Sequence, residues 1–146
     1  MKKEFVMRGQ TASGETEVLN FSGYKPGYAY RLTEFQLWGS GNIGGADMEI
    51  AGTVTAGKTA VSPVDPNFND EGLIAVALGT FRPTTQMDFG SVINDTFLIT
   101  QNLILMAQDL GAGSRAVNWQ CRFVAEKMNN AEEAAANFKQ FSISDV

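Results

Sequence analysis

The stretch "AVNWQCRFVAEKM", residues 116–128, decides the fold class of this chain. Apolar or small side chains occupy every odd position from 117 to 125, whereas polar ones occupy all but one of the even positions between them. Strict alternation with a period of two puts one set of side chains on one face of an extended strand and the other set on the opposite face. The stretch therefore predicts a β-strand with one buried face, and Cys121 lies on that face.

The same period recurs along the chain. Small or apolar residues stand at every even position of 46–57, which predicts a half-buried strand. In 28–38 the apolar face changes parity near Thr33, which predicts a β-bulge. Residues 94–110 alternate over a length unusual for one strand, so we expect this segment to bend or to be interrupted.

Shorter strands and turn-rich connections complete the pattern. Glycine and proline fall where alternation stops, which is typical of loops between strands. The shorter strands are expected at 4–8, 16–21 and 73–81, and the loops at 22–27, 39–45, 62–72, 82–90 and 111–114. We predict an all-β fold: an antiparallel, jelly-roll-like β-sandwich of about seven or eight strands.

The C-terminus changes character in "NNAEEAAANFKQF". Asn130 can cap a first helical turn and Glu133 follows three residues later, as in a capping box. This predicts one short α-helix at about 130–141, which packs against the sheets through small residues and two phenylalanines. Its expected buried face consists of Ala131, Ala134, Ala135, Phe138 and Phe141. We expect residues 1–146 to form one domain.

Composition excludes several classes of protein. The formal net charge is −5 and the basic residues are scattered, so we expect no nucleic-acid partner. No signal peptide is recognisable, and the apolar run at 103–107 is far shorter than a membrane span, so we expect a chain made in the host cytoplasm with no membrane partner. One cysteine cannot form an intrachain disulfide.

One motif points to nucleotide binding and has to be weighed. Residues 52–59, "GTVTAGKT", match the phosphate-loop pattern of P-loop nucleotide-binding proteins. The residues between its glycines continue the strand alternation, and Pro63 and Pro66 would break a helix that starts at Lys58. A phosphate loop needs such a helix to face the anion, so we reject nucleotide binding.

Other chemical motifs are incomplete. Asp65, Asn67 and Asn69 stand at the first three ligand positions of an EF-hand calcium loop, but Asp70 replaces the required glycine and Val76 the final glutamate. A cation bound through loop carboxylates remains an alternative to a turn-rich surface loop.

Residues suited to catalysis are scarce. The chain has no histidine, which removes the common triads and most metal sites. Asp47 and Glu49 share a strand face, and we interpret them as surface charges. Cys121 is interpreted as a core residue. We therefore assign no catalytic, cofactor-binding or metal-binding residue, expect no cofactor, and expect that the protein is not an enzyme.

Aromatic residues offer a different function, the stacking of sugars on a lectin-like sandwich. Aromatic side chains on alternating strands are ordinarily part of the core, so burial is the favoured interpretation. The aromatic residues concerned are Tyr24, Tyr28, Tyr30, Trp38 and Trp119.

Four blocks together resemble a family of small uncharacterised virion-associated proteins of marine tailed bacteriophages. They are "FVMRGQTASGETEVLNFSGYKPGYAYRLTEFQLW", "PNFNDEGLIAVA", "INDTFLITQNLI" and "VNWQCRFVAEKMNNAEEAAANFKQFSISD". The resemblance spans nearly the whole chain. It implies a component of the virion, and it brings no functional residue with it.

This resemblance and the predicted fold lead to an expected function. We expect a phage virion structural protein located in the virion, namely a capsid decoration or cement protein that forms a homo-oligomer and binds the major capsid protein or other virion proteins. A tail-tube or connector subunit and a carbohydrate-binding module are the alternatives. The expected contact regions are the segment before Gly9 and the loops 39–45, 62–72 and 82–90.

Overall fold

The fold is taken from a computed structural model of the chain. Its described residues include all eight strands and most of the connections between them. They are 3–21, 27–41, 47–57, 59–82, 86–111, 113–129, 131–132, 135–136, 138–139 and 143.

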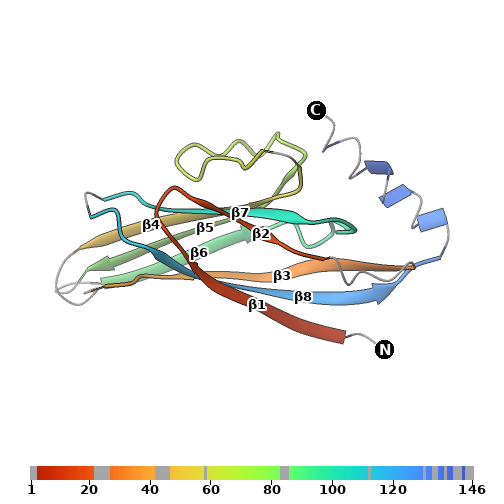
Figure 1. Ribbon diagram of the computed structural model, residues 1–146, viewed down its shortest axis with the longest axis horizontal. Helices are drawn as coiled ribbons and strands as arrows, with labels where there is room; N and C mark the ends of the chain where they lie inside the picture. The colour runs from red at the N-terminus through yellow and green to blue at the C-terminus, as the bar shows by residue number, and fades with distance from the viewer. Residues whose placement is uncertain are drawn as a thin grey trace.

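Eight strands form two antiparallel sheets that pack face to face as a sandwich (Figure 1). The smaller sheet has the order β1-β8-β3, and the larger has the order β2-β7-β4-β5-β6. The bounds of the smaller sheet are β1 Lys3–Thr11, β8 Val117–Lys127 and β3 Tyr28–Trp38. The bounds of the larger are β2 Thr16–Leu19, β7 Leu103–Asp109, β4 Met48–Thr55, β5 Leu73–Arg82 and β6 Gln86–Ile93. The prediction of an antiparallel β-sandwich is confirmed.

The strand order follows a nested pattern. The first strand pairs with the eighth, the second with the seventh and the fourth with the fifth, which is the nesting of a jelly roll. Full nesting would also pair β3 with β6. Instead β6 pairs with β5 and extends the larger sheet, so one sheet has five strands and the other has three.

Strand β8 lies at the centre of the smaller sheet, and its alternation is confirmed along its length. Its odd residues from 117 to 125 are buried and its even ones are half-buried. On β3 the register against β8 shifts between Leu32 and Glu34, so the predicted bulge is present. The extra residue, Thr33, donates its hydroxyl to the Arg122 carbonyl at 3.2 Å.

The inner faces of the two sheets form a single continuous core. At one end Phe5, Phe21, Tyr30 and Phe123 contact one another with ring centroids 5.1 to 6.3 Å apart. Near the middle the sheets approach closely at Gly52. A Cβ atom there would lie 3.1 Å from the Phe35 ring, so only glycine fits without displacing the opposite sheet.

The expectation of a half-buried strand at 46–57 is wrong for residues 50–55 of β4, although Met48 is buried and Glu49 exposed as predicted. Every residue from Ile50 to Thr55 is buried, and the outer face of the strand is covered by the chain that follows it. The Thr53 hydroxyl donates to the Val61 carbonyl at 2.6 Å, and the Val61 N–H donates to the Thr55 hydroxyl at 3.2 Å. The threonines that suggested a solvent face thus bond the returning chain.

The long segment 94–110 is interrupted, as expected. Only Leu103–Asp109 forms strand β7. Before it, the Asn94 side chain accepts hydrogen bonds from the N–H and the hydroxyl of Thr96, which closes a turn. Ile99 then crosses to the other sheet and exchanges two backbone hydrogen bonds with Tyr30.

The predicted helix at 130–141 lies partly outside the described residues, which include no continuous helix there. Six described residues of that segment have helical backbone, and the described capping bond comes from Asn129: the Glu132 N–H donates to Asn129 Oδ1 at 2.8 Å. The expectation that Phe138 anchors this segment is wrong, because Phe138 is 73% exposed. Ala136, which the prediction left off the buried face, is buried and packs against Ala29 and Met128.

Burial also corrects two residues of the predicted helical face. Ala131 and Ala135 are exposed, and the remaining members, Ala134 and Phe141, lie outside the described residues, as do Asn130 and Glu133. Within the described part of the chain, no helix reaches the length and apolar character that crossing a bilayer requires.

Candidate functional site

Strand β6 forms where a loop was predicted. Residues 86–90 belong to β6 and Arg82 to β5, so the loop expected at 82–90 is wrong over those parts, and residues 83–85 lie outside the described residues. Proline and glycine near the segment favoured a turn, and the strand forms because its backbone pairs without a break against β5, from Arg82 with Gln86 to Ala75 with Ile93. The alternating apolar residues Met87 and Phe89 were the signal that could have revealed it.

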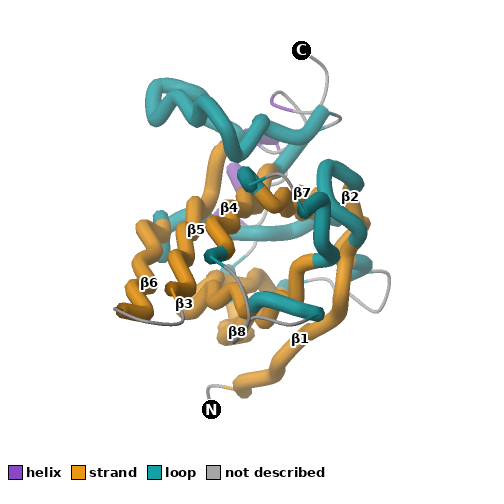
Figure 2. The backbone as a smooth tube through the Cα atoms, turned by 90° about the vertical axis from the view of Figure 1, so that its left-hand side faces the viewer, coloured by secondary structure: helices purple, strands orange, loops and turns teal. Residues whose placement is uncertain are grey.

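One face of β6 points into the sandwich but is left uncovered. Met87 lies opposite the buried Phe81, and Phe89 lies opposite Gly79, so both side chains are on the inner face. Met87 is nevertheless 57% exposed and Phe89 is 46% exposed. The reason is the unequal size of the sheets: β6 lies at the lateral edge of the larger layer, and β3 is the nearest strand of the other layer (Figure 2).

Trp38, the last residue of β3, faces this uncovered strip. Its indole ring lies edge-on to the Phe81 ring, with centroids 5.3 Å apart. Together with Met87 and Phe89 these rings line an apolar hollow of about 220 Å³ between the edges of the two sheets. Trp38 was expected in the core, and that expectation is wrong, because its side chain is 52% exposed. After the bulge the even-numbered residues of β3 lie on the outer face of the smaller sheet, and Trp38 is the last of them.

The outer face beside β6 is apolar as well. Leu78 on β5 is 46% exposed and Val92 on β6 is 58% exposed. Both line a shallow hollow of about 440 Å³ on that face. We call the exposed apolar residues on both sides of this sheet edge the β6 surface: Trp38, Leu78, Met87, Phe89 and Val92.

The backbone of β6 also presents unpaired groups. The Asn94 N–H donates to the Ile74 carbonyl, and this bond shows which residues of β6 direct their backbone groups toward β5. In an antiparallel ladder alternate residues bond the same neighbour, so the even-numbered residues of β6 bond β5. Met87, Phe89 and Ser91 therefore direct their N–H and C=O groups outward, where no described strand pairs with them.

The outer face of the smaller sheet carries a second hollow, of about 640 Å³. Trp38 lies at its margin, beside Gln36 on the same strand and Asn118 and Gln120 on β8. Arg8 on β1 lies opposite Gln120 and also lines the hollow. An exposed indole next to amide and guanidinium groups combines a flat apolar face with hydrogen-bonding groups.

The other aromatic residues proposed for sugar stacking lie elsewhere. Trp119 is buried, and its indole N–H donates to the Thr11 hydroxyl at 2.9 Å. Tyr30 belongs to the aromatic part of the core, and Tyr28 is exposed at the far end of β3. Tyr24 lies outside the described residues.

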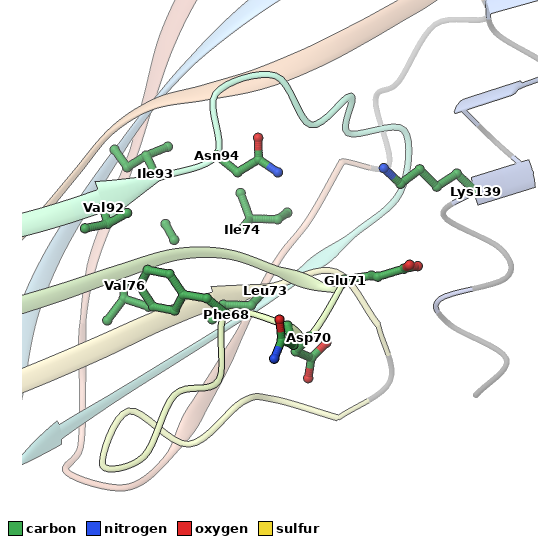
Figure 3. A pocket seen from close by; sticks show the side chains of 12 residues that line it. Phe68, Asp70, Glu71, Leu73, Ile74, Val76, Val92, Ile93, Asn94 and Lys139 are labelled. Carbon is green, nitrogen blue, oxygen red and sulfur yellow. The ribbon is translucent and has the colours of Figure 1, made fainter.

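A third hollow, of about 360 Å³, lies between the 62–72 loop, β5 and the end of β6 (Figure 3). Asp70 and Glu71 line it from the loop, Asn94 from the turn after β6, and Lys139 from the C-terminal segment. The Lys139 ammonium lies 5.3 Å from the centre of the Phe97 ring, which is a cation–π distance. Charges of both signs therefore flank this hollow.

The loop that suggested a calcium site is held by its own side chains. Asn67 Oδ1 accepts the Asn69 N–H at 2.9 Å, and Asp70 Oδ1 accepts the Gly72 N–H at 2.9 Å. Among the residues that the structure describes, no three acidic, cysteine or histidine side chains gather as a metal site would require. The loop folds through Asx turns.

The phosphate-loop match forms part of the sandwich. Gly52 packs against Phe35 and Leu37, and the hydroxyls of Thr53 and Thr55 bond Val61. Lys58 lies outside the described residues. The described residues 59–72 form turns and bends with no helix, so the match occurs in a strand followed by a loop that returns over the same sheet.

The remaining candidates lie where the sequence placed them. Cys121 is fully buried, and burial raises the pKa of its thiol well above the ordinary value. Asp47 and Glu49 are exposed.

No protein-family model matches this chain, and no curated protein sequence matches it. The function therefore has to be argued from the surfaces described above.

Proposed function

We propose that this chain is a structural protein of a phage virion, a decoration or cement protein that binds the capsid shell by protein–protein contact. The observation that carries the proposal is the β6 surface, whose five apolar side chains are each 46% to 58% exposed. Exposed apolar side chains gathered at one edge of a fold are typical of protein interaction sites.

The physical basis of cementing is linkage. A protein that binds only the assembled shell lowers the free energy of that state, so disassembly requires more heat or denaturant. Repeated copies on one shell multiply a weak contact through multivalency. The fold suits this role, because jelly rolls recur among viral capsid domains and their rigid sheets hold a contact surface in place.

Location in purified particles is the decisive test. Particles of the phage that encodes the chain should contain it in stoichiometric amounts by mass spectrometry, and electron microscopy should place it on the outside of the shell. Particles that lack it should lose their genome at a lower temperature than complete ones. If purified particles do not contain the chain, the proposal is wrong.

Microscopy also separates the rival structural role. A tail-tube or connector subunit would form rings or tubes and would be found on the tail axis or at the capsid vertex. A cement protein would instead bind preformed capsids.

The hollow on the smaller sheet supports a second candidate function, binding of a carbohydrate. Its carrying observation is Trp38, half exposed beside the amides of Gln36, Asn118 and Gln120. Indole rings stack on the apolar face of sugars, while amides bond hydroxyl groups. Calorimetry with hits from a glycan array tests this function: Trp38→Ala should abolish binding, and Tyr28→Ala, at the other end of the same strand, should not. Absence of any specific hit excludes it.

A further inference from the structure

We propose that two copies of this chain pair through the open edges of their β6 strands, antiparallel and about a two-fold axis, so that the two five-stranded sheets become one continuous sheet. The inference rests on the proposed assembly function, because it assigns the β6 surface a specific partner. That partner is a second copy of the chain.

The first argument is the chemistry of the edge. Met87, Phe89 and Ser91 direct backbone donors and acceptors outward over the length of an eight-residue strand. Edge strands that remain unpaired are usually protected by lysine, proline or a bulge. β6 contains neither lysine nor proline, its ladder to β5 has no register shift, and its one charged residue is Asp88.

The other edges of the sandwich differ in this respect. Strand β1 carries Lys3, Glu4 and Arg8. Strand β2 is only four residues long and carries Glu17. The outer edge of β3 is bridged by Ile99 at Tyr30 and interrupted by its bulge. Of these edges, β6 alone combines length, an unbroken ladder and only one charged residue.

Symmetry and charge favour a register with Phe89 at the axis. We consider a two-fold pair in which the inner faces of both five-stranded sheets lie on the same side. In such a pair an odd-numbered residue of β6 lies opposite an odd-numbered residue of the second copy, and an even-numbered one opposite an even-numbered one. Placing Phe89 opposite its own copy puts Asp88 opposite Gly90 of the second chain. This register avoids facing the two Asp88 carboxylates and uses the outward N–H and C=O groups of Phe89 for two hydrogen bonds across the axis.

The size of the apolar surface matches what such a pair requires. A large aromatic side chain has a surface of roughly 150–250 Å², and an aliphatic one has less. Because about half of each side chain is exposed, the five residues of the β6 surface together expose on the order of 500 Å² of apolar area. A stable interface buries about 800 Å² per partner, of which roughly 60% is apolar. The β6 surface therefore has an apolar area of the size that one such interface needs.

The test measures self-association of the purified full-length chain, without capsids. Sedimentation equilibrium of the 15.8 kDa chain should give a species of twice that mass. Phe89→Lys adds one ammonium per copy at the axis, so the dissociation constant should rise at least about 100-fold, since truncation of a central contact alone costs tenfold or more per copy. The matched control is Val18→Lys, which alters a residue 62% exposed on the opposite edge of the same sheet and should leave the dimer intact.

A second variant and a measurement on the unaltered chain protect the test against misfolding. Ser91→Pro removes an outward N–H but no bond to β5, so circular dichroism should be unchanged while the dimer is lost. In the unaltered chain, hydrogen exchange at the amides of Met87, Phe89 and Ser91 should slow as protein concentration rises. Exchange that is independent of concentration contradicts the pairing.

The outcomes separate this inference from the proposed function. A monomer at about 100 µM, well above the Kd expected for a standard interface, overturns the pairing, as does any oligomer that survives Phe89→Lys. In either case the chain can still be found on virions, and the cement role stands. A β6-dependent dimer that is absent from purified virions supports the pairing and refutes the cement role.

Discussion

Replacing Gly52 by alanine tests the role that the structure gives to the phosphate-loop match. The added methyl would lie 3.1 Å from Phe35 Cζ, and 3.2 and 3.3 Å from the two methyl carbons of Leu37. Phe35 is fully buried and Leu37 nearly so, which leaves neither side chain room to rotate away. The two sheets must therefore separate by a few tenths of an ångström or accept a strained rotamer.

The expected cost combines two opposing effects. Overpacking in a closed core costs about 1–3 kcal/mol. Alanine also reduces the entropy of the unfolded chain, which returns about 0.4–1 kcal/mol. The net loss of unfolding free energy should be about 1–2 kcal/mol, and for a domain of this size the Tm should fall by roughly 3–6 °C.

The assay is equilibrium unfolding in guanidinium chloride, at a protein concentration low enough to keep the chain monomeric, with Gly90→Ala as the matched control. Gly90 also lies in a strand of the larger sheet, but a Cβ there meets nothing within 4 Å. The control should leave the midpoint unchanged or raise it slightly. If Gly52→Ala is as stable as the control, the close approach of the two sheets at this position is refuted.

Three further predictions follow from the site and the core. Asp109 is buried, and its carboxylate accepts hydrogen bonds from the N–H groups of Gly111 and Arg115 at 2.9 and 3.0 Å. Asp109→Ala should therefore lower the free energy of unfolding by about 2–3 kcal/mol, and Asp109→Asn by less. Equal losses for the two variants would contradict this account. Burial raises the pKa of the Cys121 thiol, so the folded chain keeps its proton while the unfolded chain releases it above about pH 8.5. The free energy of unfolding should therefore fall as pH rises beyond that value. Urea unfolding at pH 8 and pH 9.5 should show this fall in the unaltered chain but not in Cys121→Ala. An equal change of the unfolding free energy with pH in both proteins would refute the role of the thiol. Adding MgATP or MgGTP should leave the Tm of the unaltered chain unchanged, and a shift that is lost in Lys58→Ala would restore the nucleotide-binding hypothesis.

The local pattern of the sequence determined most of the fold. Alternation with a period of two reports which strands have one buried face, and it identified β8, the bulge at Thr33 and the interruption before β7. These features depend on neighbouring residues in the chain, so the sequence contains them. The same reasoning placed Cys121 in the core.

Tertiary structure decided everything that depends on which segments meet. The sequence of β4 could not show that residues near Val61 return over its outer face, since that burial comes from another part of the chain. Nor could it show that β6 would join β5 and extend beyond the three-stranded sheet, which leaves Met87 and Phe89 about half exposed on an inner face. Local periodicity shows which side chains share a face of a strand. Whether that face is covered depends on the number and order of strands in both sheets. The candidate site lies on a face of β6 that the smaller sheet does not cover.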